Sequence, residues 1–119
     1  MTRMILAIGL ALAALAVAHD EPTGKPITVV GQVIDTGCYL VHDSKGAGHA
    51  ACAEKCAKAG VPLAILDDSG KVFLPVGAEH TNPNPKLMPF IEKRVKVTGV
   101  SVVKAGVNGI AIKTVEAAQ

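Results

Sequence analysis

The segments RVKVTGVSVV (residues 94–103) and GIAIKTV (residues 109–115) decide the fold of this chain. Apolar and polar side chains alternate along both segments, and β-branched residues are frequent in them. Such alternation is typical of strands that bury one face. Because only the short break at 104–108 separates the two segments, the sequence predicts a β-hairpin here.

Further strands and a helix are predicted upstream of this hairpin. Residues 27–35 alternate and are β-branched, so they predict the first strand. Thr36-Gly37 breaks that pattern and places Cys38 at the exit of the strand. The Ala-, Lys- and Glu-rich stretch 49–59 lacks Pro and Gly, and Gly60 stands where a helix commonly ends. We therefore expect a short helix after the first strand.

A second hairpin and a second short helix are predicted in the middle of the chain. The strand-like segments 62–66 and 71–76 flank Asp-Asp-Ser-Gly (67–70), whose short polar side chains and glycine favour a tight turn. Residues 86–92 predict a helix that Pro89 limits to about one turn.

The order of these elements predicts a mainly β fold. Five strands with a helix between the third and the fourth are the connectivity of an OB-type Greek-key barrel. In this reading a short helix bearing Cys and His is inserted after the first strand, and a second short helix precedes the fourth. A small open α+β sheet is the alternative.

The N-terminus predicts export. Arg3 precedes an apolar run over 5–17, and the small residues Ala16-Val17-Ala18 follow. These are the parts of a cleavable signal peptide, with the cut before His19. A membrane anchor is the alternative, but a spanning helix needs about 20 apolar residues and this run is shorter. We therefore expect a signal peptide over 1–18, a single domain over 19–119, a periplasmic or secreted location, and no stable membrane insertion after cleavage.

Composition argues against several classes of partner. The formal net charge is only +2, so no basic surface for nucleic acid is indicated. One Tyr, two Phe and no Trp leave few platforms for stacking bases or sugars. The common hydrolase, zinc-protease and nucleotide-binding motifs are missing from the sequence, so catalysis is not the first expectation.

The chemically versatile side chains gather in one short segment. Three cysteines, an odd number for an oxidising compartment, and two histidines follow the spacing C-x3-H-x6-H-x2-C-x3-C between 38 and 56. On a helix, His49, Cys52 and Cys56 share one face, and the glycine-rich loop before them allows Cys38 to reach back. We predict a Cys38, His49, Cys52 and Cys56 site for a zinc or copper ion, because Cys3His suits Zn²⁺ and thiolates suit Cu⁺.

Other interpretations of these residues stay open. Cys38 forming a disulfide with Cys52 or Cys56 would leave one spare thiol, and buried thiols can also be inert. His42 is a candidate to replace His49 as the imidazole ligand. Asp35 or Asp43 would then orient an imidazole from outside the ligand set. After cleavage, a new N-terminal His19 could also chelate copper.

A family resemblance follows from the same motif. The segments G-x-V-I-D-x-x-C-Y (31–39), G-H-x-x-C-A-x-x-C (48–56) and G-x-P (60–62) resemble a group of small exported bacterial OB-fold-like proteins. This resemblance implies fold and compartment more than activity.

Three functions are therefore expected in order. The first is an exported metal-binding protein with a structural, storage or delivery role. The second is a thiol–disulfide redox protein in which Cys52 would react first. The third is a module that binds a protein or glycan partner on the barrel face.

Overall fold

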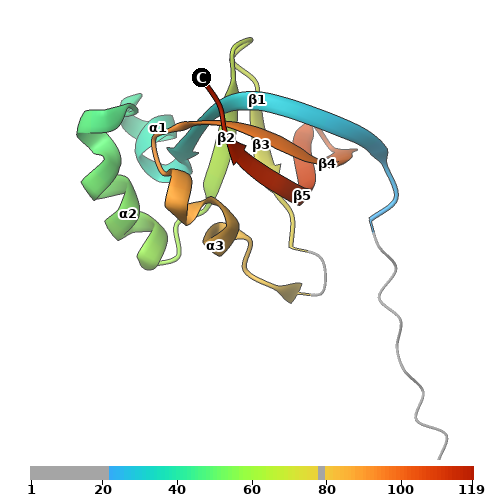
Figure 1. Ribbon diagram of the computed structural model, residues 1–119. Coiled ribbons are helices and arrows are strands. Elements are labelled where there is room, and N and C mark those ends of the chain that lie inside the picture. Colours follow the sequence, from blue (N-terminus) through green and yellow to red (C-terminus); the bar gives the residue numbers. More distant parts are fainter. Residues whose placement is uncertain (1–21, 78–79) are drawn as a thin grey trace, which may run out of the picture.

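A closed β-barrel forms the body of the protein (Figure 1). The computed structural model describes residues 22–77 and 80–119. Within these residues the strands follow the order β1-β2-β3-β5-β4 around the barrel. The parallel pairing of β3 with β5 closes it, and the other neighbours are antiparallel. The predicted OB-type barrel is confirmed, with strands β1 (Lys25–Asp35), β2 (Leu63–Asp67), β3 (Val72–Pro75), β4 (Arg94–Lys104) and β5 (Val107–Ala117).

The β4–β5 hairpin is longer than its sequence pattern indicated. The ladder continues to Lys104 opposite Val107, because Ala105 and Gly106 both adopt positive φ and make a tight two-residue turn. The register shifts between Thr98 and Gly99. A Cβ at Gly99 would stand 2.2 Å from the carbonyl oxygen of Ala111, so the close approach of the two strands requires glycine.

The core lies inside the barrel. Alternate residues of the long strands point inward, and α2 (Ala50–Lys58) adds two alanines at one end. The buried apolar residues with no exposed surface are Val33, Ala53, Ala64, Leu63, Ile65, Leu87, Val95, Val97 and Ile110, apart from about 1% at Leu63.

The connection between β1 and β2 contains a helix that the sequence reading missed. Thr36-Gly37 was expected to break the chain and to leave Cys38 at the strand exit. Instead, α1 (Thr36–His42) begins directly after β1, followed by η1 (Ala47–His49) and α2. The cause is Asp35, whose side chain caps α1 and so offsets the low helix propensity of Gly37.

The predicted helices are present with shifted ends. The α2 helix gives way to Gly60, which has φ of 100°, as expected of a residue after a helix C-terminus. The second predicted helix consists of α3 (Asn84–Leu87) and η3 (Met88–Phe90). Buried Asn84 links α3 to its surroundings: its Oδ1 accepts from Leu63 N (2.9 Å), and its Nδ2 donates to Val61 O (2.9 Å).

The predicted signal peptide over 1–18 and His19 lie outside the described residues. In the described part of the chain, no helix has the length and apolar character needed to cross a bilayer.

Candidate metal centre

Helix α1 positions Cys38. The Oδ1 atom of Asp35 accepts from the N–H groups of Gly37 (2.8 Å) and Cys38 (3.3 Å). Thr36 fixes the same turn to the start of β2, because its N–H and its hydroxyl both donate to Pro62 O (3.1 and 2.8 Å). The first turn of α1, including Cys38, is therefore held to the barrel at two points.

Helix α2 positions the other two thiols. Ala53 and Ala57 are buried against the barrel, and their small side chains let the helix lie close to it. Cys52 and Cys56 each precede one of these alanines, so they lie on the neighbouring face of the helix. The spacing of four residues therefore places the two thiols one turn apart, as the sequence predicted.

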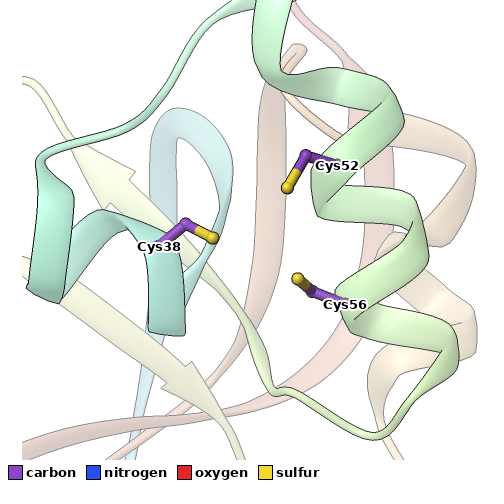
Figure 2. Close-up of side chains that lie close together, drawn as sticks. All are labelled: Cys38, Cys52 and Cys56. Carbon is purple, nitrogen blue, oxygen red and sulfur yellow. The ribbon is translucent and has the colours of Figure 1, made fainter.

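The three thiols of the chain meet between the two helices. Figure 2 shows the sulfur of Cys38 pointing across the gap toward those of Cys52 and Cys56. The three Sγ atoms lie within 4.8 Å of one another, and all three cysteines are free. In a tetrahedral zinc site with bonds of about 2.3 Å, sulfur atoms lie about 3.8 Å apart. A small inward movement of the side chains is therefore enough to close around an ion.

A second group of donors overlaps the first. Asp35, Cys38 and His49 also offer ligand atoms within 4.8 Å of one another, so Cys38 belongs to both groups. The Nε2 atom of His49 lies 3.8 Å from Oδ2 of Asp35. Both atoms are buried, and neither has a hydrogen-bond partner in the structure. Unpartnered buried polar atoms are costly, so their placement beside three thiols fits a site that completes itself with a cation.

The electrostatics of the cluster are dominated by the buried carboxylate. Proximity to Asp35, followed by burial, raises the pKa of Cys38 to about 12. The same causes in the same order raise the pKa of Cys56. Although burial acts in the opposite direction, interactions with the Cys38 thiol and with the N–H groups of Cys38 and Gly37 lower the pKa of Asp35. Without a cation, the thiols of Cys38 and Cys56 stay protonated at neutral pH and the carboxylate stays charged.

A buried glutamate that the sequence reading did not single out supports the loop before His49. Oε2 of Glu92 accepts from the N–H of Gly46 (2.7 Å) and from Nε2 of Gln32 (2.8 Å). Gly46 directly precedes η1, whose last residue is His49. No local pattern marks this role, because Glu92 and Gly46 are 46 residues apart in the chain.

Two other candidates stand away from the donors. His42 is exposed at the end of α1 and belongs to neither donor group. Asp43 ends the same helix with a left-handed conformation and pairs with Lys45 at 3.6 Å. Of the two acids proposed to orient an imidazole, only Asp35 faces one.

An apolar groove of about 590 Å³ lies beside α1. Its lining includes Tyr39 and Leu40 of α1, Val72 and Leu74 of β3, and Val107 of β5. Leu40 is 75% exposed, so this side of α1 is open to solvent.

The donor set fits a thiophilic metal ion. Cys38, His49, Cys52 and Cys56 lie in one cluster, which is the Cys3His set that zinc sites use. The same thiolates suit Cu⁺.

Comparison with protein-family models, with curated proteins and with solved structures gives no match for this chain. The resemblance to small exported OB-fold-like proteins therefore stays a prediction from the sequence.

Proposed function

We propose that this chain is an exported protein that binds one zinc or copper ion through Cys38, Cys52 and Cys56, with His49 as the fourth ligand. The single observation that carries this proposal is the convergence of the three free thiols from two helices. Buried thiols that serve only as packing have no need to face one another. The buried, unpartnered carboxylate of Asp35 beside them adds negative charge that favours a cation.

The proposal gives Asp35 and His49 distinct tasks. His49 supplies the imidazole ligand, and the carboxylate of Asp35 orients the ring, as outer-shell carboxylates do for metal-bound histidines. Export is supported by the segment over 1–18, with its charge, apolar run and small residues before His19.

Metal binding tests the proposal directly. The full chain is expressed in a bacterial host, and the mature protein is isolated from the periplasm, reduced and titrated with Zn²⁺ and with Cu⁺ under anaerobic conditions. We expect one tightly bound ion for each chain. Cys52→Ser should weaken binding, whereas Ala51→Ser, which places a hydroxyl at the exposed neighbouring position, should leave it unchanged. Binding well below one equivalent that Cys52→Ser leaves unaltered would falsify the metal site.

The same preparation distinguishes the alternatives. A reversible disulfide between Cys38 and one of the α2 cysteines, with no bound metal, would favour a thiol–disulfide redox protein. N-terminal sequencing checks the compartment: a periplasmic protein that begins at His19 is expected, and an uncleaved cytoplasmic chain would contradict export.

A further inference from the structure

The four cysteine and histidine donors are unequally accessible. The Asp35 side chain has no exposed surface, and that of His49 is 14% exposed. Cys38 and Cys56 are half-buried, but Cys52 is exposed. The cluster therefore has a closed side, formed by the barrel and α1, and an open side at Cys52.

The chain around the thiols is also unequally anchored. Cys38 lies in the turn capped by Asp35, and the carbonyl of Cys56 accepts from the N–H of Val61 (3.0 Å). Cys52 lies in the first turn of α2, where the preceding His49 makes no side-chain cap. Its neighbour Ala51 is exposed and carries only a methyl group.

From this asymmetry we propose that the protein transfers its metal ion to a thiol-bearing acceptor by ligand exchange at Cys52, an inference that rests on the proposed function. Sites with a purely structural role enclose their ligands, whereas exchange requires one ligand that an incoming group can reach. The exposed sulfur at the edge of the cluster meets this requirement, and the half-buried sulfurs retain the ion meanwhile.

The exchange step needs no change of oxidation state. A thiolate of the acceptor donates an electron pair to the metal, forming a new metal–sulfur bond. The bond from the metal to Cys52 breaks, its electron pair stays on the Cys52 sulfur, and this thiolate takes up a proton from water. Cys38 and Cys56 hold the ion until a second acceptor thiolate arrives, so a dithiol is the smallest acceptor that completes the transfer.

Transfer kinetics test the inference. The mature protein loaded with one equivalent of Zn²⁺ is mixed with dithiothreitol in excess, and the metal that leaves the protein is followed with a colorimetric zinc indicator. If the acceptor attacks the bound ion, a tenfold rise in dithiothreitol should raise the rate about tenfold. A rate that stays constant over this range would show that the ion dissociates first, and it would overturn the inference.

Thiol alkylation gives a second, independent measurement. Loaded and metal-free protein are treated with iodoacetamide, and the labelled peptides are identified by mass spectrometry. We expect Zn²⁺ to protect Cys38 and Cys56 at least about tenfold more than Cys52. Equal protection of all three thiols would contradict an open side at Cys52.

The two levels of the argument fail separately. If no zinc is retained before the acceptor is added, the proposed metal site itself is wrong. If zinc is retained but leaves at a rate independent of dithiothreitol, the metal site stands and transfer at Cys52 does not.

Discussion

Asp35 connects the two halves of the cluster through one side chain. Its Oδ1 caps the helix that carries Cys38, and its Oδ2 faces His49, which directly precedes the helix that carries the other thiols. A buried charge is expensive unless it is compensated. The N–H groups of α1 compensate part of this charge, and a bound cation beside the thiols would compensate more.

The charge of Asp35 controls the protonation of Cys38, which gives the first prediction. Asp35→Asn keeps a side-chain oxygen that can cap α1 but removes the charge that disfavours a neighbouring thiolate. We expect the pKa of Cys38 to fall below its value of about 12. Thiolate absorbance of the metal-free protein, followed against pH in the ultraviolet, measures this shift. Asp43→Asn is the matched control at the other, exposed end of α1. An unchanged titration in Asp35→Asn would refute the electrostatic role of Asp35.

At the scale of elements, α1 and α2 owe their relative position to contacts that lie far apart in the chain. Thr36 binds Pro62 O, Gly46 binds Glu92, and Asn84 binds both Val61 and Leu63. Each contact ties a segment of the β1–β2 connection to another element. The thiols therefore meet because the barrel holds both helices in place.

Glu92 provides a test of this support. Glu92→Ala removes the only printed acceptor of the Gly46 N–H, so the free energy of unfolding should fall by about 1–3 kcal/mol. The Gly46 amide should exchange with solvent faster, which hydrogen-exchange NMR detects. Glu54→Ala, which removes an exposed i,i+4 pair with Lys58 on α2, should cost less than about 1 kcal/mol. Unaltered exchange at Gly46 in Glu92→Ala would mean that Glu92 does not hold this loop.

The β2–β3 turn gives a prediction of pH dependence. Hydrogen bonds from the Ser69 side chain and the Lys71 N–H lower the pKa of Asp67, and the Arg94 guanidinium lowers that of Asp68. Because these pKa values are lower in the folded state, the stability they confer is present above the unfolded value of about 3.9 and is lost as the pH falls through the folded values. Urea midpoints should therefore drop on acidification, and Asp67→Asn should reduce the drop. Glu116→Gln, at an exposed position of β5, is the control; an Asp67→Asn profile identical to the parent's would contradict this account.

Local patterns predicted the elements with strong periodicity and missed those that depend on a single contact. The strands, the Asp67–Gly70 turn and the helix ending near Gly60 follow from residues close in sequence. Helix α1 was missed because Gly37 was taken as a break, although Asp35 two residues earlier is a strong N-cap. The Glu92 contact had no local signal, since its partners lie on other elements.

The candidate site was predictable for a similar reason. His49, Cys52 and Cys56 are neighbours on one helix, so their convergence follows from helical periodicity. The approach of Cys38 needed the barrel, which brings the end of β1 beside α2. The pairing of Asp35 with His49, and the unequal exposure of the thiols, depend on burial that no spacing encodes.

At the scale of the whole molecule, a bound ion would join segments that the barrel alone holds apart. The predicted domain of 19–119 is small, and domains of this size gain much from a metal or a disulfide. An ion held by Cys38 and by the α2 thiols would link the end of β1 to the segment that leads into β2. Since unfolding would then have to release the ion, metal binding and folding should be coupled.

Thermal unfolding measures this coupling. With free Zn²⁺ at about 100 times its dissociation constant, the folded state gains about 2.7 kcal/mol. For a domain of this size we expect Tm to rise by about 10–20 °C. Cys38→Ser should lose most of this increase, because only Cys38 connects α1 to the ion, whereas Ala51→Ser should keep it. An equal increase in Cys38→Ser would show that zinc binds to α2 alone, and the site would then hold one helix together instead of joining two.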